Sequence, residues 1–453
     1  MLLNALSPRL RQQLLAGIGL LLLLGGILFN LANAPRNGQD FSAFYYKAGA
    51  RFTAGLSPYV FSGDPLRLHD AELGLAPPIA ITGNGYPPLT SALMGLFVPL
   101  GETVGQYVFL LISLVIFCLG LWRFLPYALP SWSRAAHLFV VGATTFASSV
   151  RWSAGQYQLS LLALGLVCLA FDAELRQQTV AVILLTAFNL KITLILPIVG
   201  LLLLRRRIGV LVAAGALSIG LNLCCLSWTG FLESYAGWRI NVANYIIVNG
   251  LNYPSVSTLV ARIHGDPALA VIPPGIAMYD GFGYYYYPEG THWVLLMSAF
   301  FTTLKAANWA AAILAAFFVL PLAWLGWRLR GDSNDRETLL RWFAVWTCFG
   351  LVCVTHLKYD LLMLIPVCFI ALRFTLEQRK FADGALALTS FVTAYCLAAR
   401  VATKWIYGVA IPSKQYWLIP IYSHLATLAF VFALWGLAVH ALNRAQTRRM
   451  TVS

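Results

Sequence analysis

A few polar residues could do chemistry in a chain that is otherwise mostly apolar. Asp40 follows the first long apolar run and precedes an aromatic-rich stretch. A carboxylate in such a place can act as a general base if a neighbour keeps it ionised. It can equally cap the helix expected from Phe41 onward, because Asp is a good N-cap residue. The two roles are compatible, and Asp40 is therefore a candidate catalytic residue.

Three cations could hold an anionic group. Lys191 lies inside the apolar stretch 179–204, where an ionisable residue is costly and is by default a functional candidate. His356 and Lys358 lie together between two later apolar runs, and this pair could clamp a lipid phosphate. The competing interpretations are an ordinary interfacial histidine and a lysine whose charge reaches out to water.

Two further motifs could contact a polar ligand. Gly155-Gln156 could form a tight turn that presents the Gln156 amide, although an ordinary turn explains it equally well. Tyr86 precedes Pro87-Pro88 at the start of an apolar run. The alternative role for Tyr86 is an interfacial anchor, since tyrosine favours that depth.

The composition predicts where these residues must be held. Hydrophobic residues make up 59% of the 453 and charged residues 11%, with a mean hydropathy of +0.74. Soluble domains have about 25% charged residues. Much of the exterior must therefore face lipid, and we predict an all-α, polytopic transmembrane bundle that forms one unit over residues 1–453.

The basic excess, 31 Lys and Arg against 17 Asp and Glu, fits cytoplasmic loops that follow the positive-inside rule. A nucleic-acid partner is not expected, because no basic stripe with interleaved aromatic residues is present. The eight cysteines all fall in apolar segments without metal-ligand spacing in a polar loop. We interpret them as small buried hydrophobic residues, and expect neither a disulfide framework nor a metal site.

A transmembrane helix needs about 20 apolar residues. Apolar runs with alternating basic ends predict about twelve spans with both termini in the cytoplasm. A signal peptide is the alternative for the first run, because Ala32-Asn33-Ala34 resembles a cleavage site, but the run is long for a signal. The predicted spans include 13–32, 104–122, 135–150, 157–171, 179–204, 208–227, 307–327, 338–355, 359–372, 384–399 and 416–438.

The stretch 179–204 conflicts with a single span. One long helix would place the arginines at 205–207 on the outer side, against the positive-inside rule. Two short helices hinged near residues 189–191 keep those arginines inside and place Lys191 near the outer face. Broken helices occur where the backbone lines a cavity rather than lipid.

Two long outer segments follow from this topology, 35–88 and 228–306, whereas the inner loops are short and basic. No sequence repeat relates the two halves of the chain. Large outer loops on a bundle without visible symmetry favour chemistry at the outer face over alternating access.

Short segments from most of the chain form an ordered series. They are Asp40 with Tyr46 and Ala50, residues 55–59, residues 86–89, Gly155-Gln156, Leu190-Lys191 ahead of Pro197, and residues 356–359 ahead of residues 364–366. In this order and placement they resemble the glycosyltransferase family 87 branch of the GT-C superfamily, which are polyprenyl-phosphate-sugar-dependent membrane enzymes. The segment 228–306 has no match in this series, so the acceptor stays open.

The resemblance implies inverting transfer of a sugar, with mannose as the first expectation, from a polyprenyl-phosphate donor to a lipid or glycan acceptor. It implies Asp40 as the catalytic base, no cofactor or metal, and a site on the periplasmic or extracellular face of the inner (plasma) membrane. The donor phosphate would be held by Lys191, His356 and Lys358. Substrate contacts would come from Tyr46, Tyr59, Tyr86, Gln156 and Tyr359. The alternative is a twelve-span secondary transporter of a small solute, which predicts buried charges within spans; a non-catalytic scaffold or flippase partner is a third possibility.

Overall fold

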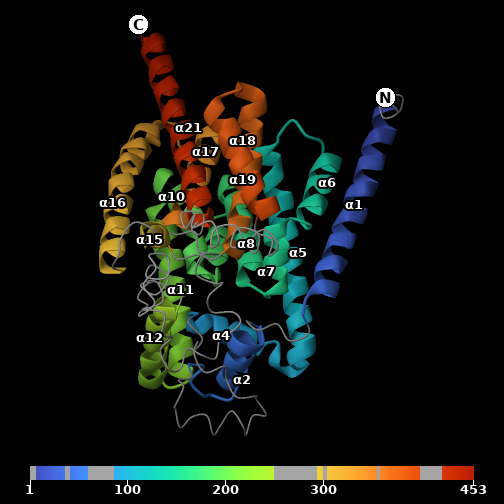
Figure 1. Ribbon diagram of the computed structural model, residues 1–453, viewed down its shortest axis with the longest axis vertical. Coiled ribbons are helices and arrows are strands. Elements are labelled where there is room, and N and C mark those ends of the chain that lie inside the picture. Colours follow the sequence, from blue (N-terminus) through green and yellow to red (C-terminus); the bar gives the residue numbers. More distant parts are fainter. Residues whose placement is uncertain are drawn as a thin grey trace, which may run out of the picture.

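The computed structural model describes residues 7–35, 41–59, 86–248, 293–298, 304–354, 358–397 and 421–452. Every element in these ranges is a helix, which confirms the predicted all-α class (Figure 1). Among the described residues, five helices are long and apolar enough to cross a membrane, and they do not confirm the expected twelve spans. Those helices are Pro8–Asn33, Glu102–Ala128, Ile208–Trp228, Trp309–Asp332 and Ile421–Thr447.

The long helices have large apolar side chains on their outer surfaces. Leu21 and Leu28 of α1 (Pro8–Asn33) are 72% and 65% exposed, and Leu320 of α16 (Leu304–Leu329) is 73% exposed. Contiguous apolar surface of this kind is rare on soluble monomers. The same pattern suits a lipid environment, as the composition predicts. The other three long helices are α5 (Glu102–Ala128), α11 (Ile208–Trp228) and α21 (Ile421–Val452).

Several predicted spans are shorter or interrupted. The predicted span 135–150 is two helices, α6 (Arg134–Thr144) and α7 (Ser148–Gly155). The hydroxyls of Thr144 and Thr145 donate to Val140 O (2.7 Å) and Gly142 O (2.6 Å), competing with regular helical bonding at this point. The prediction of one continuous span was therefore wrong here.

Non-α segments interrupt the later spans as well. The predicted span 359–372 begins with a 3₁₀ segment, η9 (Lys358–Met363), before α18 (Leu364–Gln378). The predicted span 384–399 is α19 (Phe381–Phe391) followed by a π-helix, η10 (Val392–Leu397). The predicted spans 157–171 and 338–355 correspond to α8 (Leu159–Leu175) and α17 (Arg336–Cys353).

The predicted break in 179–204 is confirmed. The chain forms α9 (Thr179–Ala187), a 3₁₀ turn η4 (Ile192–Leu194) and α10 (Leu196–Leu204). Arg207, just after α10, donates to Thr179 at the start of α9 (2.5 Å). The helical hairpin formed by α9 and α10 therefore begins and ends on the same side of the bundle. Nine residues of helix rise about 14 Å, roughly half the hydrocarbon thickness of a bilayer. The position of Lys191 near the outer face stays a prediction.

Glycines allow two helix pairs to pack backbone against backbone. A Cβ added to Gly120 of α5 would collide with Gly165 O of α8, and one added to Gly165 would lie 2.5 Å from Ile116 O. Between α1 and α6, a Cβ on Gly142 would lie 2.6 Å from Gly19 O. Small residues at helix crossings are typical of membrane bundles, where close packing holds helices together.

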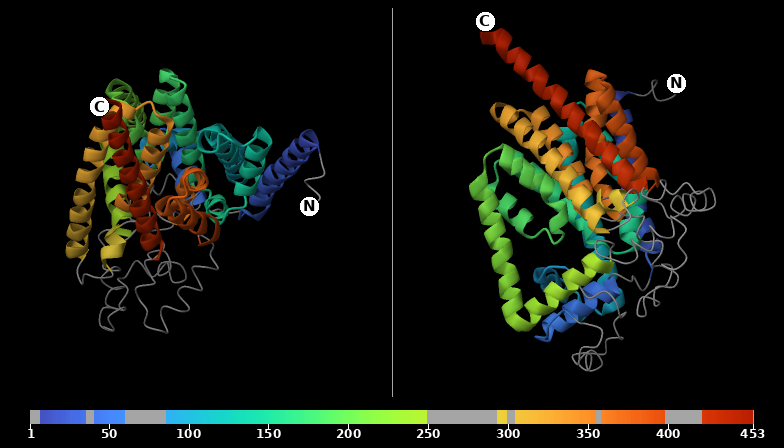
Figure 2. Two further views of the ribbon diagram at one scale, coloured as in Figure 1. Left: turned by 90° about the horizontal axis from the view of Figure 1, so that it is seen from above. Right: turned by 60° about the vertical axis from the view of Figure 1, so that its left-hand side comes forward.

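Both termini lie at one end of the bundle, as Figure 1 shows. The opposite end holds α2 (Lys47–Thr53), α4 (Pro88–Gly95) and α12 (Phe231–Val248). Figure 2 shows α12 turning back from α11 toward α2 and α4, and Trp228 Nε1 donates to Phe52 O (3.2 Å) at this turn. Of the segment 228–306, α12, α15 (Trp293–Ser298) and the start of α16 are described. The side of the membrane that each end faces stays a prediction.

Candidate active site at the Lys191 helix break

Lys191 forms a buried ring of contacts with two residues from other elements. Its side chain is 10% exposed, and Nζ donates to Asp360 Oδ1 (2.6 Å) and Ser160 Oγ (2.9 Å). Ser160 Oγ in turn donates to the same Asp360 oxygen (2.5 Å). Ser160 lies in the first turn of α8 and Asp360 in η9, so the ring joins α8, η9 and the break between α9 and α10.

The local sequence explains why the helix stops before Lys191. Asn189 Oδ1 accepts a hydrogen bond from Lys191 N (3.2 Å), a side-chain contact that replaces regular helical bonding. Asn189 Nδ2 donates to Ala163 O (3.5 Å) and ties the break to α8. Pro197 then stands in the first turn of α10, where its missing N–H costs little.

Burial makes the charges of Lys191 and Asp360 depend on each other. Lys191 is the one lysine that is buried among the described residues. Removing one partner of a buried ion pair typically costs about 3–5 kcal/mol, because it leaves the other charge uncompensated. The ammonium and the Asp360 carboxylate therefore depend on each other, unless another ion replaces one of them.

A line of tyrosine hydroxyls runs from the π-helix η2 (Phe41–Tyr46) to Gln158, two residues before Ser160 of the ring. Tyr45 Oη donates to Tyr86 Oη (3.0 Å), and Tyr86 Oη donates to Gln158 Oε1 (3.5 Å). Gln158 immediately precedes α8 and is buried. Tyr59 Oη donates to Tyr86 O (3.1 Å). The hydroxyl line thus runs from the residues that follow position 40 to the helix that bears Ser160.

The predicted residues of the first outer loop have mixed outcomes. Asp40 lies outside the described residues. Tyr59 and Tyr86 belong to the tyrosine line, whereas the Tyr46 hydroxyl donates to Val98 O (3.4 Å) instead. Burial and the nearby Glu102 carboxylate raise the pKa of Tyr46, so its hydroxyl remains a donor at neutral pH. The line contains Tyr45, which the sequence analysis did not select.

The turn at Gln156 is confirmed as a turn. Gln156 N donates to Trp152 O (3.1 Å) at the end of α7, and Tyr157 follows with a φ of 53°. Its binding role stays a prediction. His356 lies outside the described residues. Lys358 and Tyr359 lie in η9, but the positions of their side chains are not among the described features.

Asp360 and Ser160 were missed by the sequence analysis. Asp360 stands directly before the apolar run 361–365, which is the same signal that selected Lys191: an ionisable residue beside membrane-type sequence. Asking which acid could neutralise Lys191 would have pointed to it. Ser160 offers no such signal, because hydroxyls are common in membrane helices.

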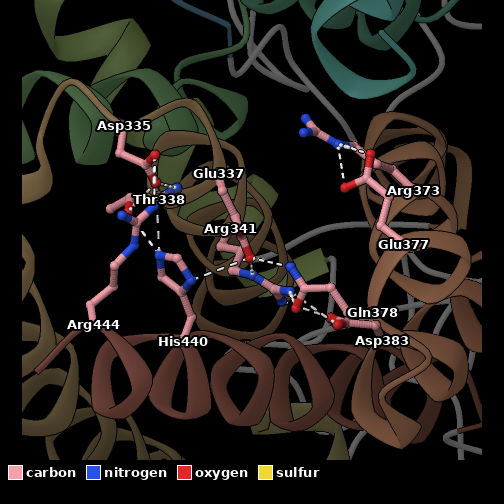
Figure 3. Close-up of polar contacts among 10 residues, drawn as sticks. All are labelled: Asp335, Glu337, Thr338, Arg341, Arg373, Glu377, Gln378, Asp383, His440 and Arg444. Carbon is pink, nitrogen blue, oxygen red and sulfur yellow. Dashed lines mark hydrogen bonds and ion pairs between the residues drawn. The ribbon is translucent and has the colours of Figure 1, made fainter. Parts of the chain in front are cut away.

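Figure 3 shows a second polar network, formed by side chains of α17, α18, α19 and α21. Arg341 of α17 donates to both carboxylate oxygens of Asp383 in α19 (2.7 and 3.0 Å) and to Glu337 (2.9 Å). His440 of α21 contacts Glu337 (3.2 Å) and Thr338 (2.8 Å). These contacts join α17, α19 and α21.

Three more residues extend this network. Arg444 of α21 pairs with Asp335 (2.7 Å), and Gln378 of α18 donates to Glu337 (2.7 Å). Burial raises the pKa of Glu337, but hydrogen bonds from His440, Gln378 and Arg341 outweigh it and hold that pKa well below its usual range. The Glu337 carboxylate is therefore ionised at neutral pH.

Among the described residues, no group of histidine, cysteine and carboxylate side chains could hold a metal ion. All eight cysteines are free thiols, but Cys224 and Cys396 are exposed on the helix surface rather than buried. The interpretation of every cysteine as a buried hydrophobe was wrong for these two, because each lies on an outward face of its helix.

Comparisons of the chain with models of protein families, with curated proteins and with solved structures find no match.

Proposed function

We propose that this protein is a membrane glycosyltransferase that moves a sugar, mannose as the first candidate, from a polyprenyl phosphate to a lipid or glycan acceptor with inversion. The observation that carries the proposal is the buried Lys191 ring, together with the tyrosine line that begins in η2, after Asp40, and reaches Gln158 two residues before Ser160. A cation and a line of hydroxyls are the groups that a sugar phosphate needs. The resemblance of the ordered segments to glycosyltransferase family 87 points the same way.

The reaction assigns a separate task to each group. Asp40 takes the proton of the acceptor hydroxyl as its oxygen attacks the anomeric carbon. The bond from that carbon to the phosphate oxygen breaks, and the lipid phosphate leaves with the electron pair. Lys191, with His356 and Lys358, balances the charge that develops on the phosphate. Hydroxyls and amides of the sugar site come from Tyr46, Tyr59, Tyr86, Gln156 and Tyr359.

The same proposal fixes the orientation in the membrane. The arginine-rich turn at 205–207 and both termini face the cytoplasm, in keeping with the positive-inside rule. The end of the bundle with α2, α4 and α12 faces the periplasm or the cell exterior, where the acceptor is reached. Cysteine labelling from outside should then modify Gly63→Cys and His292→Cys, and spare Gly331→Cys. Labelling of Gly331→Cys from outside would reject this orientation.

Asp40→Asn is the decisive test of the enzyme activity. Asn caps helices about as well as Asp but cannot accept the proton. A positioned general base contributes about 10²- to 10⁴-fold, so transfer from a radiolabelled polyprenyl-phosphate sugar to a membrane extract should fall by that factor. The melting temperature should stay that of the parent. Near-normal transfer by a stable variant would sink the proposal.

A secondary transporter is the second candidate, and the buried Lys191–Asp360 pair is the observation that favours it. Ionisable residues within membrane segments often mark ion pathways. A transporter in proteoliposomes should move a solute without consuming a polyprenyl-phosphate sugar. Sugar transfer by the purified chain in detergent, where no gradient exists, would exclude this alternative as the main function.

A further inference from the structure

Two donors converge on a single oxygen in the Lys191 ring. Asp360 Oδ1 accepts from Lys191 Nζ and from Ser160 Oγ, and both donor atoms lie within 2.6 Å of it. An anionic oxygen that accepts a charge-assisted bond from an ammonium and a second bond from a hydroxyl is also what a bound phosphate ester presents. Asp360 therefore occupies the place in this ring that a phosphate oxygen could take.

Electrostatics favours exchange over simultaneous binding. Lys191 needs an anion beside it whenever it is buried, and Asp360 supplies one. A phosphate oxygen that contacted Lys191 while Asp360 stayed in place would put two anions beside that one ammonium, whatever share of the phosphate charge His356 and Lys358 balance, and like charges in one site oppose each other's ionisation. A phosphate oxygen can replace the carboxylate oxygen without leaving Lys191 uncompensated.

Ser160 and Asp360, which both contact Lys191, lie in different kinds of secondary structure. Ser160 belongs to α8, a regular helix of 17 residues. Asp360 belongs to η9, a 3₁₀ segment of six residues directly before α18, and 3₁₀ runs longer than about four residues are uncommon because their hydrogen-bond geometry is poorer. Of the two partners, Asp360 thus has the less regular backbone, and η9 also carries the predicted site residues Lys358 and Tyr359.

We infer that Asp360 is the internal counter-ion of Lys191 and that the phosphate of the donor lipid displaces it, shifting η9 as the donor binds. This inference rests on the proposed function, because it takes a lipid phosphate as the ligand. It adds a positioning residue and a moving segment to that site. Without a donor, Asp360 keeps the Lys191 ammonium charged and in position. After sugar transfer, Asp360 competes with the lipid phosphate for Lys191 and speeds release of the lipid phosphate.

The first experiment measures binding of a radiolabelled polyprenyl phosphate, without sugar, to the purified full chain in detergent. We expect Asp360→Asn to bind at least tenfold more tightly than the parent, because the competing anion is gone, and Lys191→Met to lose binding. Asp172→Asn is the matched control: Asp172 is also buried and paired with arginines, Arg123 and Arg176, but lies at the arginine-rich end. It should bind like the parent.

The outcomes separate the two proposals. A parent protein that binds no polyprenyl phosphate overturns the proposed function and this inference together. A parent that binds, with an Asp360→Asn variant that binds equally or more weakly, overturns the inference alone. If Asp360→Asn does not fold, hydrogen–deuterium exchange on the parent decides. Saturating polyprenyl phosphate should change exchange in residues 358–363 and leave residues 336–353 unchanged, whereas unchanged exchange in 358–363 overturns the inference.

Discussion

Two buried cations in this protein are held in opposite ways. Arg341 lies between regular helices, and its planar guanidinium grips Asp383 with two parallel bonds while a third reaches Glu337 (Figure 3). Lys191 lies where a helix stops, and its Nζ reaches Asp360 and Ser160 from a flexible stem. A rigid fork fixes the geometry of its partners, whereas an ammonium is a point charge that tolerates a change of partner. The Arg341 arrangement therefore suits a structural contact that holds helices together, which we call a fastener, and the Lys191 arrangement suits a binding site.

The packing of α21 supports the first half of this contrast. A Cβ added to Gly436 would lie 3.0 Å from Arg341 Nη1 and 3.1 Å from Asp383 Oδ1. The backbone of α21 thus lies directly against the Arg341–Asp383 pair. His440 and Arg444 extend the contact along the same helix. The Arg341 network therefore joins α21 to α17 and α19.

The largest expected effect is on stability at Arg341. Arg341→Met leaves the Asp383 and Glu337 carboxylates without their main cation, and breaking a buried pair in this way costs about 3–5 kcal/mol. Thermal unfolding in detergent should show a large drop in melting temperature, with donor binding unchanged in the protein that stays folded. Arg341→Met combined with Asp383→Leu should recover much of the loss. A melting temperature equal to that of the parent for Arg341→Met would contradict the role of a fastener.

A smaller and more selective effect is expected at Lys191. Lys191→Met alone removes the ammonium that contacts the buried Asp360, so it should lower both stability and donor binding. Lys191→Met with Asp360→Leu replaces the pair by apolar groups, which is often neutral for stability. The double variant should melt near the parent yet lose donor binding worth about 1.5–3 kcal/mol, the typical value of a charge-assisted contact. Normal donor binding by a stable double variant would place Lys191 with Arg341, as a structural residue.

The smallest effect is acid sensitivity at Glu337. Its folded pKa lies below the unfolded value of 4.5, so it contributes stability that is fully present above about pH 4.5 and is lost as the pH falls toward the folded pKa. Glu337→Gln should show a shallower loss of melting temperature below pH 4.5 than the parent does. If the melting temperatures of the two proteins fall identically with pH, protonation of Glu337 does not weaken the contacts of α21.

The sequence predicted the helical class and the break at 189–191, because composition and the placement of arginines follow from the cost of charge in lipid. It did not predict the Lys191–Asp360 contact. The partners are 169 positions apart, and they meet because the break after α9 and the segment η9 both pack against α8. Hydropathy also failed at Thr144 and Thr145, where hydroxyl bonds to the backbone end a helix inside an apolar run. Local chemistry and long-range packing decide such points, and a hydropathy profile contains neither.

The close crossing of α5 and α8 at Gly120 and Gly165 restricts which elements around the site can move. Backbone meets backbone there, so α5 and α8 cannot slide past each other without a clash, and together they form a fixed frame. Ser160 stands on that frame, on the same helix as Gly165. The opening of the Lys191 ring that we propose must then occur in η9 or at the break between α9 and α10, while Ser160 stays in place.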